Sequence, residues 1–177
     1  MSAITAILSV LYSAGMSSSA SNAISLRPYR AEDQELLFAI YAGTRKDEVA
    51  AFGWNAAQQE VFLRMQFNAQ RRGYQAAYPQ ADHQIICFDG QPIGRIMVQR
   101  AADHAHLVDI ALLPEYRDRG IGGALLRELA AESDRNHVPL RLQVHKTNPG
   151  ARRLYERLGF IPCGEDEVYC QMERPPV

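Results

Sequence analysis

The sequence lacks a disulfide framework and has no basic tract. Its three cysteines, Cys87, Cys163 and Cys170, are odd in number and scattered, which argues against paired disulfides and favours a reducing, cytoplasmic setting. The 19 Lys and Arg residues are balanced by 20 Asp and Glu residues, and they form no cluster that would follow a phosphate backbone. We therefore expect no nucleic-acid partner.

The first 23 residues differ from the rest of the chain. An apolar run from Ile4 to Tyr12 precedes small residues, as in a secretory signal, but no Lys or Arg precedes Arg27, so the positive start of such a signal is missing. The run is too short to cross a bilayer, and we expect no membrane partner. We interpret residues 1–23 as a flexible or loosely docked extension. We interpret residues 24–177 as a single domain, because a chain that is 47% hydrophobic can bury a sizeable core.

Several common catalytic and binding motifs are missing. No Gly-x-x-x-x-Gly-Lys-Ser/Thr loop occurs, and "GIGG" at 120–123 lacks the last glycine of Gly-x-Gly-x-x-Gly, which argues against a P-loop NTPase and a Rossmann dehydrogenase. No Gly-x-Ser-x-Gly elbow indicates a serine hydrolase. His104 and His106 share a face at strand spacing, but no cluster of Cys, His or Glu completes a zinc site, so we expect no metal.

The hydrophobic patterns that are present predict an α/β fold, with a mixed α+β sheet of six to seven strands flanked on both faces by about four helices. The expected order is β-α-α-β-β-β-α-β-α-β. Strands are predicted at 23–29, 83–88, 91–99, 105–113, 139–145 and 164–174, and helices at 31–43, 55–69, 121–133 and 148–160. The stretch from Leu107 to His145 should form a parallel crossover unit.

Turn and cap residues support these boundaries. Asp89-Gly90 is the two-residue signal of a type I′ hairpin. The helix caps are expected at Asp33, at Asn55 with Gln58, and at Asn148 with Pro149, and a helix stop is expected at Gly159. The second helix is expected to bury Val61, Phe62, Met65 and Ala69.

Three glycines at the start of the third helix, Gly120, Gly122 and Gly123, need an explanation. Each costs about 1 kcal/mol relative to Ala inside a helix. The first turn of a helix presents unpaired N–H groups and the positive end of the helix dipole, and glycines let an anion approach them closely. With Arg117 and Arg119 beside them, the glycines predict a phosphate or diphosphate site. The alternative is a tight turn with two solvated arginines, but one glycine would suffice for that.

The segment "LLPEYRDRGIGGALL" resembles motif A of the GNAT superfamily of acyl-CoA-dependent N-acetyltransferases, with Arg117, Gly120 and Gly122 at its fixed positions. The segment "NPGARRLYERLGF" is similar to motif B of that family, in which an Asn opens the helix and a Tyr follows seven residues later. Asn148 and Tyr155 match these positions. The order of predicted elements agrees with the family from about residue 24 to residue 173.

The resemblance implies a cytosolic N-acetyltransferase that moves acetyl from acetyl-CoA to a primary amine by direct attack, without a covalent enzyme intermediate. The acceptor would be a small molecule, a peptide or a protein, and a homodimer is the first expectation because two-fold dimers are the commonest oligomers. The residues expected to bind acetyl-CoA are Ile110, Ala111, Leu112, Arg117, Asp118, Arg119, Gly120, Ile121, Gly122, Gly123, Asn148, Arg152 and Tyr155.

Direct attack leaves two protons to be moved. Tyr155 is the expected acid for the departing thiolate, although a core tyrosine on the apolar face of its helix would look the same. Asp109 interrupts an apolar strand and is the favoured base, with His106 as the other candidate. Strict alternation would place these two on opposite faces of the strand, unless a bulge intervenes. A base acting through water, or no base, also stays open.

Two further interpretations compete with these. A CoA-binding module with a regulatory or scaffolding role and no turnover needs the same diphosphate site but not Tyr155. The group "RRGYQAAY" at 71–78 could line an acceptor cleft, or it could be a solvated helix end.

Overall fold

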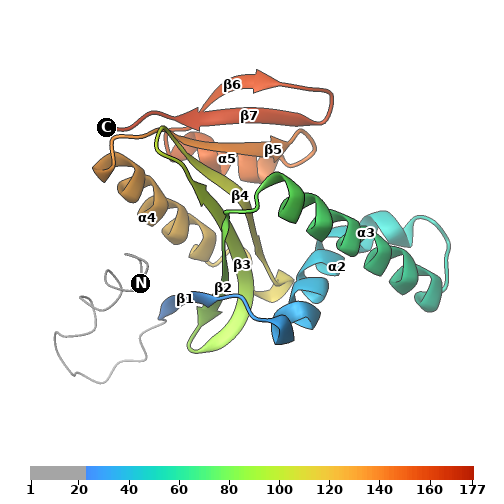
Figure 1. Cartoon of the computed structure of the whole chain (residues 1–177). Helices are drawn as coiled ribbons and strands as arrows, with labels where there is room; N and C mark the ends of the chain where they lie inside the picture. The colour runs from blue at the N-terminus through green and yellow to red at the C-terminus, as the bar shows by residue number, and fades with distance from the viewer. Residues whose placement is uncertain (1–22) are drawn as a thin grey trace.

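A seven-stranded mixed sheet with helices on both faces forms the frame of the computed structural model, which describes residues 23–177 (Figure 1). The strand order is β1-β2-β3-β4-β5-β7-β6. The strands are β1 Ile24–Pro28, β2 Asp82–Phe88, β3 Gln91–Arg100, β4 Ala105–Leu112, β5 Leu140–His145, β6 Ile161–Glu165 and β7 Tyr169–Arg174. The predicted mixed sheet is confirmed; the interpretation of residues 1–23 lies outside the described residues, apart from Ala23.

In the described part of the chain, four α-helices cover the sheet, in the predicted order. They are α2 Gln34–Ala50, α3 Ala56–Ala77, α4 Ile121–Arg135 and α5 Pro149–Arg157, and short 3-10 turns lie at η1 Ala31–Asp33 and η2 Pro114–Tyr116. The helices α2 and α3 pack on one face, and α4 and α5 pack on the other (Figure 1). No helix among residues 23–177 is long and apolar enough to cross a membrane.

Local sequence signals set most of the boundaries. Asn55 and Gln58 form a reciprocal capping box at 3.0 Å, and the Asn148 side chain accepts from the Ala151 amide at 3.1 Å. The hairpin turns at Asp89-Gly90, both with positive φ. Asp33 differs from the prediction, because its carboxylate accepts from the Arg30 amide at 2.8 Å and so caps the turn η1 rather than α2.

Among the strands of residues 23–177, β4 and β5 form the only parallel pair, and they run side by side for only three residues each. Residues 105–107 pair with residues 140–142, and beyond that point the two strands part. The helix α4 connects them, as predicted for this stretch. The parting leaves one edge of the C-terminal half of β4 without a strand partner.

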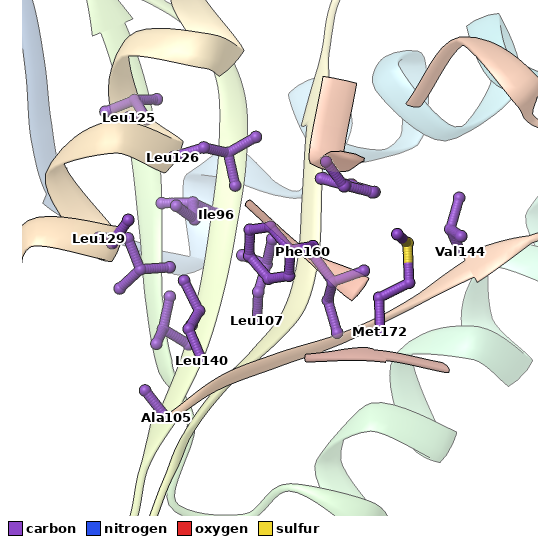
Figure 2. Close-up of a cluster of buried hydrophobic side chains, with 14 of the residues drawn as sticks. Ile96, Ala105, Leu107, Leu125, Leu126, Leu129, Leu140, Val144, Phe160 and Met172 are labelled. Carbon is purple, nitrogen blue, oxygen red and sulfur yellow. The ribbon is translucent and has the colours of Figure 1, made fainter. Parts of the chain in front are cut away.

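The larger core lies between the sheet and the helices α4 and α5. Figure 2 shows Phe160 among side chains of this cluster, which include Leu107, Leu126 and Met172. These four residues are at most 3% exposed. Burying a side chain of this size contributes about 1.5–3 kcal/mol, so this layer holds α4 and α5 firmly against β4, β5 and β7.

The predicted inner face of α3 is wrong in part. Leu63 and Phe67 are buried, whereas Val61 is 72% and Met65 is 58% exposed. The face of α3 that packs on the sheet continues from Leu63 and Phe67 to Gln70, whose Oε1 accepts from the buried Arg95 of β3. Apolar spacing could not reveal this face, because its second half packs on polar side chains.

Replacing Phe160 by alanine is expected to lower the free energy of unfolding by about 3–5 kcal/mol, because it removes a buried ring from the core and leaves a cavity. The neighbouring Ile161 is 58% exposed and provides the control. Ile161→Ala should cost less than about 1 kcal/mol. Urea unfolding of the unmodified protein and the two variants measures both free-energy changes. Equal losses of stability in the two variants would contradict this packing.

Asp33 should make stability depend on pH. Its carboxylate pairs with Arg27 at 2.5 and 2.7 Å, and the hydrogen bonds from Arg27 and from the Arg30 amide lower its pKa, against the opposing effect of burial. A lowered pKa in the folded chain gives stability that is complete above about pH 4 and is lost as the pH falls further.

Asp33→Asn is therefore expected to cost about 1–3 kcal/mol near neutral pH, because the Arg27 guanidinium loses its charged partner. The difference in free energy of unfolding between Asp33→Asn and the unmodified protein should become smaller below about pH 4. Urea unfolding from neutral to acidic pH measures this difference. A difference that stays constant with pH would contradict the role of this pair.

Candidate functional site

A groove of about 990 Å³ opens where β4 and β5 part, between the start of α4 and one side of α5. Its lining residues come from α2, β4, the turn before α4, and the helices α4 and α5. They are Thr44, Ile110, Ala111, Leu112, Arg117, Asp118, Gly120, Ile121, Gly122, Gly123, Leu126, Arg127, Asn148, Ala151, Leu154, Tyr155, Arg157 and Leu158. Of the residues predicted to bind acetyl-CoA, all except Arg119 and Arg152 are in this lining.

Gly120 and Gly122, at the start of α4, are suited to their positions for different reasons. Gly120 is the N-cap with φ 78°, a left-handed conformation that glycine adopts at little cost. A Cβ on Gly122 would meet no atom within 4 Å, so its side of the helix faces open space. The first hydrogen bond of the helix runs from the Ala124 amide to the Gly120 carbonyl at 2.9 Å, and the amides of residues 121–123 are the ones that a helix start leaves unpaired.

Three arginines give the groove positive charge against a single acid, Asp118. The Arg117 Nε donates to the Leu112 carbonyl at 3.1 Å, and its Nη2 is buried without a hydrogen-bond partner among residues 23–177. A buried guanidinium nitrogen without a hydrogen-bond partner is costly. Arg127 and Arg157 are the other two arginines of the groove lining.

Sequence reasoning missed Arg127 and Arg157 and included two arginines that lie elsewhere. Arg127 follows Gly123 by four residues, so helical spacing could have placed it at the groove. No comparable spacing in the sequence indicates that Arg157 lies at the groove. The Arg119 guanidinium lies 5.2 Å from the Tyr116 ring centre, and Arg152 pairs with Glu156 at 2.9 Å, which explains why neither is in the lining.

Tyr155 of α5 is a buried residue of the groove lining. It is 8% exposed, and its ring centre lies 5.7 Å from that of Phe160. Burial, assisted by the negative charge of Asp109, raises the pKa of Tyr155 to about 12. Its hydroxyl therefore keeps its proton at neutral pH and can donate it.

Asp109 and His106 lie on the same face of β4, the face covered by α3. The register shows why: Val98 pairs with Leu107 but Met97 pairs with Asp109, so β4 carries one extra residue, Val108, in a bulge. Strict alternation would have separated the two candidate bases. Neither of them is in the groove lining.

Each candidate base has a partner on that face. Asp109 accepts from the Arg95 Nε at 2.5 Å, and the His106 ring is stacked on Tyr78 at 5.3 Å. Burial and the nearby charges of His104 and Arg141 lower the pKa of His106, so it stays neutral at physiological pH. Residues 23–177 contain no group of three His, Cys, Asp or Glu side chains that could hold a metal ion.

Several curated proteins match part of this chain. A relative from Bacillus subtilis (strain 168) is 35% identical over 94 residues, which are 51% of this chain and 61% of the relative. The ribosomal protein bS18-alanine N-acetyltransferase of Escherichia coli (strain K12) is 38% identical over 73 residues, 41% of this chain and 49% of that enzyme. The chain thus spans about half to three fifths of these relatives.

Solved structures share the fold. The PaiA N-acetyltransferase of Thermoplasma acidophilum, in complex with coenzyme A, matches with a TM-score of 0.64 at 23% identity, over 86% of this chain and 99% of that one. The ribosomal-protein-S18-alanine N-acetyltransferase of Escherichia coli matches with a TM-score of 0.55 at 21% identity, over 86% of this chain and 94% of that enzyme.

A family model described as the acetyltransferase (GNAT) family matches residues 43–160, which include both motifs, the parting of β4 and β5, and the groove. This match covers more than half of the chain. It confirms the resemblance found in the sequence: the chain belongs to the acetyltransferase (GNAT) family.

Proposed function

We propose that this chain is an N-acetyltransferase that moves acetyl from acetyl-CoA to a primary amine by direct attack. The observation that carries the proposal is the continuity of the groove, which joins a positively charged helix mouth to a buried, protonated tyrosine. A diphosphate needs the first feature, and a departing thiolate needs the second. A module that only binds CoA would need the first alone.

The residues of the groove fit acetyl-CoA in three parts. The unpaired amides of residues 121–123, with Arg117 and Arg127, would hold the diphosphate. The free edge of β4 at residues 110–112 offers backbone groups to the amide-bearing pantetheine arm. Apolar side chains of α5, Ala151 and Leu154, would cover that arm.

Proton handling completes the proposed mechanism. Acetyl-CoA supplies the acetyl group as a thioester, so a C–N bond forms to the amine as the C–S bond breaks. Tyr155 would donate the proton that the leaving sulfur takes up, and the nitrogen would return a proton to Tyr155 as the amide forms. Asp109 is the proposed acceptor of the proton that the ammonium form of the amine must lose, since His106 is stacked beneath Tyr78.

We further propose that the acceptor amine belongs to a peptide or protein. The relatives from Bacillus subtilis and Escherichia coli are both named for an alanine of the ribosomal protein bS18. The α3-side face of β5 and β7 supports such an acceptor, because its side chains Gln143, His145, Tyr169 and Gln171 are exposed. This open, polar strip of sheet lies across the parting from Asp109 and could receive an extended chain, whereas a small amine would need no such strip.

The direct test is thiol release from acetyl-CoA with a panel of acceptors. The panel comprises a peptide with a free N-terminal alanine, the same peptide with a blocked N-terminus and an internal lysine, and a polyamine. Release that requires the free N-terminal amine supports the proposed acceptor. Release only with the polyamine contradicts the peptide assignment, and acetyl-CoA binding without release for any acceptor favours the non-catalytic module.

Tyr155→Phe is expected to lower kcat about 100-fold and to leave acetyl-CoA affinity within about twofold, because only the proton donor is lost. Tyr41→Phe is the control, since Tyr41 is equally buried, at 6% exposure, but lies on α2 outside the groove. Steady-state kinetics and calorimetric binding measure the two effects. Full activity of Tyr155→Phe would reject the proposed acid.

Gly122→Leu should weaken acetyl-CoA binding by at least about tenfold, because the new side chain occupies open groove space while meeting no protein atom at its Cβ. The matched control is Gly73→Leu on α3, where a Cβ also meets nothing within 4 Å. Both variants gain helix propensity, up to about 1 kcal/mol, so thermal unfolding should not fall. Equal affinity in the two variants would argue against a cofactor site at this helix mouth.

A further inference from the structure

Arg95 on β3 is a buried cation at the centre of the face beneath α3. It is 5% exposed, and its guanidinium contacts two elements besides its own strand. The Nε donates to the Asp109 Oδ2 on β4 at 2.5 Å, and the Nη2 donates to the Gln70 Oε1 on α3 at 3.2 Å. The Tyr74 ring of α3 lies 5.5 Å from the guanidinium carbon.

The pairing of Arg95 with Asp109 uses only one carboxylate oxygen. Arginine commonly binds a carboxylate through two parallel hydrogen bonds. Here the Nη2 is directed to Gln70 instead, and Asp109 Oδ1 has no hydrogen-bond partner among residues 23–177. The Asp109 side chain is 20% exposed, so this second oxygen is available to another donor.

The charge of Asp109 also acts on two tyrosines of different elements. Its charge raises the pKa of Tyr155 on α5 and that of Tyr74 on α3, in each case after burial as the larger cause. Asp109 directly precedes Ile110 and Ala111 of the groove lining, while its side chain contacts Arg95 on the face beneath α3. An ammonium group on this face would meet a carboxylate oxygen close to the tyrosine that is proposed to donate the other proton.

We propose that Arg95 is a positioning residue for the acceptor amine: it fixes Asp109 through Oδ2 and leaves Oδ1 to bind the ammonium group. Gln70 holds the far side of the guanidinium, so α3 takes part in placing the acceptor. This inference rests on the proposed function. It adds two residues, Arg95 and Gln70, that lie outside the groove lining and outside both motifs, although Arg95 pairs in the sheet with Ala111 of the lining.

The main test is a double-mutant cycle of Arg95→Lys and Asp109→Asn. Lysine keeps the charge but loses the two-directional contact, so Arg95→Lys should lower kcat/KM for the acceptor about tenfold, with the KM for acetyl-CoA unchanged within about twofold. In the Asp109→Asn background the same change should have little further effect, because the group that Arg95 positions is already lost. Additive losses would overturn the proposal, since they mean that Arg95 acts without Asp109.

A second variant guards against misfolding of Arg95→Lys. Gln70→Met removes the acceptor for Nη2 at a half-buried position, and Gln75→Met, at an exposed position of the same helix, is its control. Gln70→Met should raise the KM for the acceptor about threefold or more and leave thermal unfolding close to that of the control. An unchanged acceptor KM in Gln70→Met would overturn the role of α3.

The same assays separate this inference from the function beneath it. If the unmodified protein releases no thiol with any acceptor, the proposed function fails and the inference fails with it. If the unmodified protein is active and the Arg95 and Gln70 variants match it, only the positioning role fails.

Discussion

The short parallel pairing of β4 and β5 is the constraint on which the site depends. Three residues of each strand pair, and the parting beyond them frees one edge of β4 and opens the groove in front of α4. A full-length parallel pair would fill this space with hydrogen bonds between the strands. The buried layer around Phe160 and Met172 keeps the two halves of the sheet in place although they separate. The groove therefore follows from the way the strands and helices are arranged.

The bulge at Val108 has a second consequence at the same place. It moves Asp109 onto the face beneath α3, opposite to the core that holds Leu107. The carboxylate then meets Arg95, while Tyr155 approaches from α5. The strand β4 thus has its backbone edge at the groove and the Asp109 side chain on the face beneath α3. In the proposed mechanism, acetyl-CoA and the acceptor would meet at this strand from these two sides.

Short-range signals allowed much of the fold and of the helix mouth to be predicted. Caps such as Asn148 and the hairpin at Asp89-Gly90 each depend on a few neighbouring residues. The inner face of α3 could not be predicted from apolar spacing, because Gln70 is inward and Val61 outward. The register of β4 was also open, since a bulge depends on the neighbouring strand. The contact of Arg95 with Asp109 follows from that register and so could not be derived in advance.

The most direct test of the central claim is a crystal structure of the protein with coenzyme A. The account predicts the diphosphate at the amides of residues 121–123, near Arg117 and Arg127, and the pantetheine arm along residues 110–112 of β4. Density for the coenzyme at another surface, with the mouth of α4 closed by the protein's own side chains, would contradict it.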